Sequence, residues 1–432
     1  MVFGPCQGPG VLDFPTSNLV LGGQPIPWRK EYKYVGVVFN STTRDIFRSH
    51  YKLKHETTAY VFWKTILGCD HYVGRGRLPP EVGRQLYYAL LDCHLTHGCD
   101  VAIDVDETSF ALLNGVNLVI LRRILGVGKR SGIPQLYSEL GIYPLRVRRV
   151  LLALRYLAYL VDQPQSHFAW KSLYEADRLR NAGHSSWYGD IAAVLHELPF
   201  AAPTLPPLAG LTSAILDQLQ KQLIIAMKQW VIDSVEGMVS IPLLHGRLEP
   251  QETGAPKRIP LCQRHYLSAV TVSDHRLALT RLLCGSFYFR GLRSNPEIHP
   301  AASLLCRKCS GALETPGHVF LQCRDVQTVA AREVLRDSLM QGFGMTLRTP
   351  VSAADAHRLL QELIFDFGTV APVARFIYKV VRAWRFFGRR LPTMVSELAP
   401  DTDDEVDLWD FETATEDGSD LELSGMDMEI DI

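Results

Sequence analysis

The sequence has no long uninterrupted hydrophobic run. Its longest apolar stretch, from Val150 to Val161, is interrupted by Arg155 and is shorter than the roughly 20 apolar residues that span a bilayer. The first residues lack the basic segment and the apolar stretch of a secretory signal peptide. We therefore expect an intracellular protein, cytoplasmic or nuclear, with no membrane partner.

A disulfide framework is absent as well. The nine cysteines are unevenly spaced along 432 residues, and such usage is typical of a reducing compartment. Six of them lie outside any metal-binding pattern. We expect these six to be free, buried thiols: Cys6, Cys69, Cys93, Cys99, Cys262 and Cys284.

Basic residues are missing from the end of the chain. Residues 401–432 hold 14 Asp and Glu and no Lys or Arg, whereas residues 1–400 hold 45 Lys and Arg against 32 Asp and Glu, a formal charge of +13. A basic body favours a polyanionic partner such as RNA or DNA, unless its charges are spread evenly over the surface.

Several catalytic signatures are also absent. The sequence contains neither the phosphate-binding pattern Gly-x-x-x-x-Gly-Lys-Ser/Thr nor the nucleophile pattern Gly-x-Ser-x-Gly. Its one Asp-Asp pair, Asp403-Asp404, lies in the acidic tail. Asp100, Asp104 and Asp106 are closely spaced, but a solvated loop or a helix cap explains them better than metal ligation. We therefore predict no catalytic residue.

A metal-binding pattern is present. Cys306, Cys309, His318 and Cys323 are spaced Cys-x2-Cys-x8-His-x4-Cys. Three thiolates and one imidazole make the closed tetrahedral set of a structural Zn²⁺ site, which leaves no open position for catalysis. The alternative is that two unrelated cysteines lie near a surface histidine.

Residue patterns predict a mainly α-helical fold with a small β hairpin at its start. Leu19–Leu21 runs into Gly22-Gly23, a hairpin-type turn, and Tyr32–Phe39 has the composition of one strand. Helical spacing begins near Ser49. Later helices are expected at 211–235, 325–341, 352–367 and 372–389, with a loop at 237–262 and disorder from Pro400.

Short motifs occur in the order known from one family. Tyr32-Lys-Tyr-Val-Gly-Val37, Leu121-Arg-Arg-Ile-Leu-Gly-Val127, Leu136–Leu145 and the Cys306–Cys323 knuckle resemble successive landmarks of non-LTR retrotransposon reverse transcriptases. Met1-Val-Phe-Gly resembles the segment before the first of them. The resemblance covers residues 1–165 and 275–325 best.

The resemblance implies a division of the chain. It predicts the end of a palm with a primer-grip-like hairpin at 1–45, a helical thumb-like region at 46–165 and a helical connector at 166–300. A zinc knuckle at 301–325, C-terminal helices at 326–395 and a disordered acidic tail at 396–432 follow.

The resemblance also implies that the polymerase chemistry lies elsewhere. These polymerases hold two metal ions with palm aspartates, two of which sit in an aromatic-x-Asp-Asp turn. This chain begins after that turn, so we expect it to use Mg²⁺ only when a complete palm is supplied. The endonuclease and RNase H domains of such elements are not found either.

By resemblance, Tyr34, Val35 and Gly36 belong to the primer grip, where a glycine lets a nucleic-acid backbone approach closely. The alternative is an ordinary pair of strands. Arg307 and Lys308, between the first two knuckle ligands, suit phosphate contact. Zinc that only stabilises the fold is an equal alternative.

The predicted helix at 372–389 has an apolar side that includes Phe376 and Trp384, and it carries Arg375, Lys379 and Arg382 largely elsewhere, beside these aromatic residues. This combination suits single-stranded nucleic acid. An ordinary amphipathic helix with a solvated basic face is the simpler alternative.

We therefore predict a C-terminal fragment of a reverse transcriptase that binds RNA or DNA and is inactive alone. The alternative is a non-enzymatic interaction protein whose acidic tail recruits protein partners, because Leu408, Trp409 and Phe411 are interleaved with carboxylates there. A decayed element product, or a merely solubilising tail, is a third interpretation.

One prediction concerns the acidic tail. If it competes with nucleic acid for the basic body, deleting residues 401–432 tightens nucleic-acid binding at low salt, because the tail's 14 carboxylates no longer occupy cationic side chains. Fluorescence anisotropy with a labelled oligonucleotide measures this. Unchanged affinity would remove the idea.

Overall fold

The computed structural model describes residues 20–25, 29–43, 45–74, 77–129, 131–292 and 301–384. The chain divides into one unit of residues 1–391 and a second of residues 392–432. The second unit contains the whole of the predicted acidic tail, which lies outside the described residues, as does Cys6.

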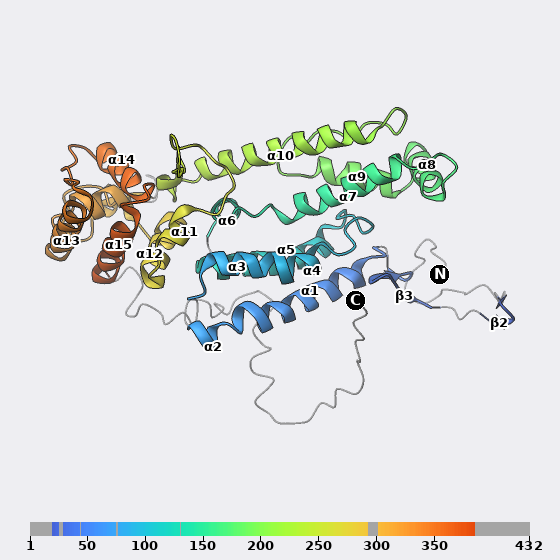
Figure 1. The fold of residues 1–432 in the computed structure, drawn as a ribbon, viewed down its shortest axis with the longest axis horizontal. Coiled ribbons are helices and arrows are strands. Elements are labelled where there is room, and N and C mark those ends of the chain that lie inside the picture. The colour runs from blue at the N-terminus through green and yellow to red at the C-terminus, as the bar shows by residue number, and fades with distance from the viewer. Residues whose placement is uncertain are drawn as a thin grey trace, which may run out of the picture. The chain divides into compact units, whose positions relative to one another are not determined.

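The prediction of a mainly helical fold is confirmed (Figure 1). The α-helices are α1 (Arg48–Phe62), α2 (Asp70–Val73), α3 (Pro80–Leu86), α4 (Asp92–Thr96), α5 (Glu107–Leu125), α6 (Ile133–Leu140), α7 (Leu145–Val161), α8 (Phe168–Asn181), α9 (Trp187–His196), α10 (Ser213–Glu236), α11 (His265–Ala269), α12 (Ser273–Leu283), α13 (Val326–Phe343), α14 (Ala353–Ile364) and α15 (Val370–Trp384).

Short turns complete the helical part. Wide π-helical turns lie at Trp63–Leu67, Tyr87–Leu91 and His318–Gln322, and tight 3₁₀ turns at Pro242–Leu244, Arg290–Leu292 and Ala301–Leu304. The predicted helices at 211–235, 325–341 and 352–367 correspond to α10, α13 and α14, and residues 237–262 form a loop as expected.

Two antiparallel strand pairs form the small β structure: β1 (Val20–Leu21) with β2 (Gln24–Pro25), and β3 (Glu31–Tyr34) with β4 (Val37–Asn40). The prediction of one strand over Tyr32–Phe39 is therefore wrong. Val35 and Gly36 have positive φ angles of 48° and 77° and form the tight turn between β3 and β4. Two such residues in succession are typical of a hairpin turn.

Helix α5 begins and ends at capping residues. The Asp106 side chain accepts a hydrogen bond from the backbone N–H of Ser109 and begins α5, as the helix-cap interpretation expected. Gly126 ends α5 in the left-handed conformation. Among the described residues, α5 is also the one helix long and apolar enough to cross a membrane, but most of it is buried inside the protein.

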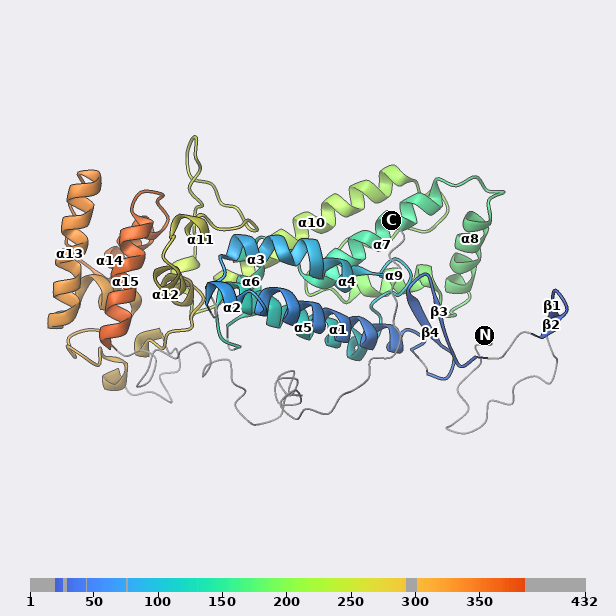
Figure 2. The same ribbon diagram turned by 60° about the horizontal axis from the view of Figure 1, so that its bottom comes forward.

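Two hydrophobic cores hold the described helices together. The first draws on α1, α3, α5, α6 and α11–α15 and contains Tyr87, Leu279 and Ile377. The second lies among α7–α10 and contains Leu154 and Leu223. Figures 1 and 2 show α7 beside α9 and α10, and α12 beside α15. The range 46–165, predicted as thumb-like, contributes to both cores.

Asp104 corrects the idea of a solvated loop. Its side chain and that of Arg149 are each 2% exposed, and the Arg149 Nε donates to both carboxylate oxygens at 2.9 Å. Tyr51 also donates to Asp104, at 2.5 Å. The interaction fixes α1, the segment before α5, and α7 together, because a buried charge is stable only when it is paired.

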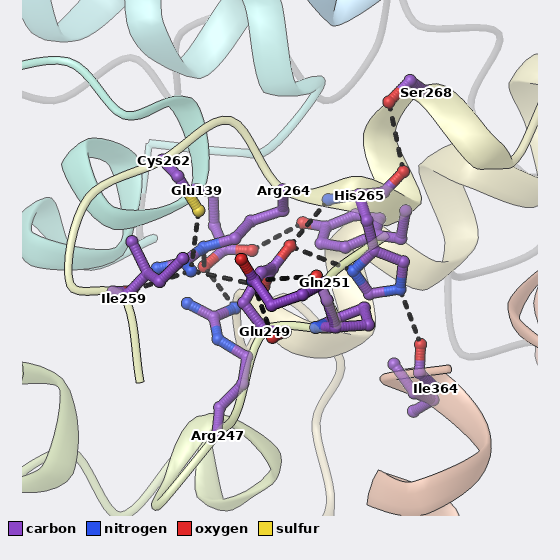
Figure 3. A network of polar contacts seen from close by, with 12 residues as sticks. Glu139, Arg247, Glu249, Gln251, Ile259, Cys262, Arg264, His265, Ser268 and Ile364 are labelled. Carbon is purple, nitrogen blue, oxygen red and sulfur yellow. Dashed lines mark hydrogen bonds and ion pairs between the residues drawn. The ribbon is translucent and has the colours of Figure 1, made fainter. Parts of the chain in front are cut away.

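A second buried polar network centres on Glu139 of α6, whose side chain has no exposed surface. Arg247 donates to Glu139 at 2.7 Å, and Tyr266 donates to it at 2.8 Å (Figure 3). Arg247 and Arg264 both donate to the Ser138 hydroxyl oxygen, at 3.0 and 2.6 Å. Residues 108 to 127 positions apart in the sequence are thereby joined.

Glu249 carries this network to the C-terminal helices. It accepts hydrogen bonds from Arg264 at 3.3 Å and from the His265 backbone N–H at 2.8 Å, and its carboxylate lies 3.0 Å from His265 Nδ1 (Figure 3). The other ring nitrogen of His265 lies 3.2 Å from the carbonyl oxygen of Ile364, at the end of α14. Burial acts to raise the pKa of Glu249, but these partners lower it to about 2.

The lowered pKa of Glu249 predicts a stability change with pH. The pKa of Glu249 falls from its usual value of 4.5 to about 2. The ionised carboxylate therefore adds roughly 3 kcal/mol to the free energy of unfolding. That contribution is present above pH 4.5 and is lost as the pH falls towards 2. We therefore expect Glu249→Gln to lower the free energy of unfolding at neutral pH by about this amount, measured by denaturant titration.

The difference from the wild type should shrink as the pH falls from 4.5 towards 2. Glu252→Gln is the matched control, because Glu252 is exposed three residues further on. An equal effect of both substitutions, or a constant difference at all pH values, would contradict the prediction.

Candidate metal centre and basic surfaces

The structure brings the four predicted metal ligands together. The ligand atoms of Cys306, Cys309, His318 and Cys323 all lie within 4.8 Å of one another. The Cys306 and Cys323 sulfurs are 3.8 Å apart, and the Cys309 sulfur is 3.2 Å from His318 Nε2. This cluster can hold a metal ion, and its donor set is compatible with zinc.

A small hairpin-like turn positions the first two ligands. Leu305 forms an antiparallel bridge with Leu313, and the Cys306 N–H donates to the carbonyl oxygen of Ala312 at 2.8 Å. Ser310 sits at a positive φ of 53° and donates to the Cys306 carbonyl oxygen at 2.8 Å. The chain thereby reverses between Cys306 and the second half of the site.

The second two ligands belong to a core element. His318 begins the π-helical turn His318–Gln322 and Cys323 follows it. Within this turn Phe320 is fully buried in the first core, with its ring 6.0 Å from that of Phe376 on α15. A Cβ on Gly317 would lie 3.0 Å from the backbone of His357 on α14. A side chain at this position would therefore crowd the backbone of α14.

Burial governs the electrostatics of the cluster. It raises the pKa of the Cys323 thiol to about 12, and Cys306 acts in the same direction. It lowers the pKa of His318, and the nearby Arg332 lowers it further. A neutral imidazole is the form that binds a metal, and a bound cation offsets the cost of several thiolates in a small volume.

Arg307 does not lie free for phosphate contact. Its backbone N–H and Nε donate to the Glu314 carboxylate at 2.8 and 2.9 Å, and its terminal nitrogen donates to the Tyr288 carbonyl oxygen at 2.8 Å. Glu314 has no exposed side-chain surface. The pair braces the ligand-bearing turn, whereas the Lys308 side chain is exposed.

Sequence reasoning missed Glu314. A glutamate seven residues after an arginine has no local pattern that predicts pairing, because the two meet only when the Cys306–Leu313 turn folds back. Burial acts to raise the pKa of Glu314, but the hydrogen bonds from Arg307 lower it.

The predicted primer-grip residues lie at the tip of the β3–β4 hairpin. Tyr34 and Val35 are 63% and 77% exposed. A Cβ on Gly36 would lie only 2.5 Å from His97 Nε2. The group that closely approaches Gly36 is thus the His97 side chain of this protein, where the resemblance predicted a nucleic-acid backbone.

Two lysines lie at or near the hairpin. The pKa of Lys54 is lowered by burial and then by the charge of Lys33 on β3. The pKa values of His94 and His97 are lowered by burial and by Lys54, although Asp100 acts in the opposite direction on His97. Because a lowered pKa favours the neutral imidazole, the positive charge here comes from Lys33 and Lys54.

Helix α15 carries the second basic surface. Its apolar face is buried, including Phe376, as predicted. Arg375 and Arg382 are exposed and Lys379 is half-buried, and Arg382 donates to the Tyr378 hydroxyl at 3.1 Å. Among the described residues, no carboxylate forms an ion pair with these three cations, which therefore lie along a positively charged face.

The other cysteines agree only in part with the expectation of buried thiols. The eight cysteines in the described ranges are free. Cys99 and Cys284 are buried, Cys69 and Cys262 are half-buried, and Cys93 is exposed.

No protein-family model, curated protein or solved structure matches the chain.

The metal centre yields a prediction. Purified protein should contain one zinc ion per chain, and Cys323→Ser should abolish zinc retention, because the remaining ligands no longer close the site. Metal analysis measures the stoichiometry. Cys93→Ser, which replaces an exposed cysteine outside the cluster, should retain the zinc.

Since a ligand variant can fail to fold, the wild type provides a second measurement. A chelator should lower its melting temperature by about 5 °C or more, and added zinc should restore it. Unchanged melting together with zinc-free protein would contradict a metal site at these four residues.

Proposed function

We propose that this chain is the C-terminal part of a non-LTR retrotransposon reverse transcriptase that binds RNA or DNA. The observation that carries the proposal is the closed cluster of Cys306, Cys309, His318 and Cys323. It occurs where the resemblance places the zinc knuckle, after the hairpin and helical motifs in the same order. We take its ion to be structural Zn²⁺.

The basic surfaces support nucleic acid as the ligand. One includes the exposed tip of the β3–β4 hairpin with Lys33 and Lys54, and the other includes Arg375, Lys379 and Arg382 on α15. Phosphates attract such unpaired cations, and exposed aromatic rings add stacking to single-stranded ligands. Lys308 would add a contact at the metal centre.

The chain contributes binding and no polymerase chemistry in this proposal. Asp104 is engaged by Arg149 and Asp106 caps α5, so neither is available to hold a catalytic ion. DNA synthesis requires a palm with its own aspartates, and Mg²⁺ would bind there. Free thiols in the described ranges fit an intracellular protein.

The acidic tail favours a second candidate. The 14 carboxylates of residues 401–432, interleaved with Trp409 and Phe411, are typical of segments that recruit protein partners. A non-enzymatic interaction protein would bind its partner through this tail, whereas a decayed element product would bind nothing specifically.

Salt dependence separates these candidates. We expect the chain to bind a single-stranded RNA oligonucleotide with an affinity that falls steeply as salt rises. Replacing Arg375, Lys379 and Arg382 together by glutamine should reduce the log–log salt slope by about 2, because each lost phosphate contact removes about 0.7. Fluorescence anisotropy over a salt series measures both.

A matched control variant removes three positive charges from a different surface. Lys171, Arg178 and Lys221 are exposed on α8 and α10, and their replacement by glutamine should change the slope much less. Equal losses in both variants would mean that charge is spread evenly. Absence of salt-dependent binding in the wild type would overturn the proposed function.

A further inference from the structure

Exposed aromatic residues concentrate near the start of the described chain. Eleven aromatic side chains have large exposed surfaces in the described ranges, and five of them lie between residues 32 and 72. Tyr32 and Tyr34 belong to the hairpin. The other three lie at the far end of α1 and beyond it, where Tyr60 is 61%, Trp63 47% and Tyr72 91% exposed.

Tyr60 and Trp63 share one surface with a cation. Lys64 Nζ lies 4.7 Å from the centre of the Trp63 ring and 5.7 Å from that of Tyr60. No other aromatic ring of the described residues stacks on Tyr60 or Trp63. Trp63 also begins the π-helical turn Trp63–Leu67. This conformation is rare in proteins overall, and where it does occur it is often at a functional site.

The acidic side chains of the adjoining helices α1 and α2 are already paired. Glu56 on α1 pairs with Lys52 at 3.9 Å, and Asp70 pairs with the buried Arg123. Among the described residues, no carboxylate forms an ion pair with Lys64. An anionic ligand therefore meets a cation and two aromatic rings here, with no unpaired carboxylate from the neighbouring α1 or α2 to repel it.

We infer that Trp63 and Tyr60 form a platform on which an unpaired base stacks while Lys64 binds the adjoining phosphate. The inference rests on the proposed function and makes its ligand single-stranded. Bases inside a duplex have both faces covered by their neighbours, so they cannot stack on a side chain. An unpaired base presents a free face, and aromatic side chains bind such faces without sequence preference.

The platform and the hairpin are separated by about the length of helix α1. β4 packs against α1, and the hairpin lies near the beginning of this helix, whereas α2 follows its end (Figure 2). The 15 residues of α1 span about 22 Å at 1.5 Å per residue. A single strand of several nucleotides is long enough to cover this distance.

The test compares one sequence in two forms. Binding of the full chain to a labelled 20-nucleotide poly(U) RNA and to a duplex RNA of equal length is measured by anisotropy. Trp63→Ala should weaken binding of the single strand about tenfold, a loss within the range for one stacked base. It should change duplex binding by less than about twofold, and Trp63→Phe should restore most of the single-strand affinity.

Tyr174→Ala is the matched control. Tyr174 is 53% exposed on α8, and its ring stacks on Trp170 with centroids 5.5 Å apart, so its loss should leave both affinities unchanged. Circular dichroism verifies that the variants remain folded.

The outcomes separate this inference from the proposed function. Wild-type binding that Trp63→Ala leaves unchanged would overturn the platform alone. Equal losses for single strand and duplex would overturn its preference for unpaired bases. A change of oligomeric state in Trp63→Ala would identify the surface as a protein contact. If the wild type binds no nucleic acid, the proposed function fails first.

Discussion

The pairing of buried charges is the constraint on which this helical unit depends. Glu139 and Glu249 are almost entirely enclosed, and each is stable there only because it is paired with arginine. Arg247 comes from the loop after α10, and Arg264 comes from the segment that leads into α11. The irregular loop 237–262 is therefore fixed by charge as well as by its buried residues Ile241, Leu243 and Leu244.

The metal-ligand cluster depends on the same packing. Its first half is an exposed turn braced by Arg307 and Glu314, and its second half is a π-helical turn buried among α13, α14 and α15. The cluster is thus part of the hydrophobic core and not an appended module. A ligand that contacts Lys308 would consequently meet a surface supported by the C-terminal helices.

The sequence predicted the long helices well, because their apolar spacing persists over many turns. The span 211–235 differs from α10 by only a few residues at its ends, and the buried face of α15 was expected at Phe376 and Trp384. The four metal ligands were predicted because close spacing and donor type are both local properties. The structure then confirmed that these residues come together.

Features that depend on distant partners were not predictable. A valine with positive φ is rare, so the turn at Val35 and Gly36 carried no usual hairpin signal, and one strand was predicted in place of two. The burial of Asp104 depends on Arg149, 45 residues away. Arg307 looked like a phosphate ligand because nothing near it in the sequence identifies Glu314 as its partner.

The spacing of the cluster has a consequence in polymer terms. A metal ion held by Cys306 and Cys323 closes a loop of 17 residues, and a disulfide across a loop of that size restricts the unfolded chain by about 3 kcal/mol. A coordinated ion imposes the same restriction without oxidising either sulfur. The bound ion would thus cross-link the chain much as a disulfide does. Thiol reductants would leave this cross-link intact, and only the supply of metal would control it.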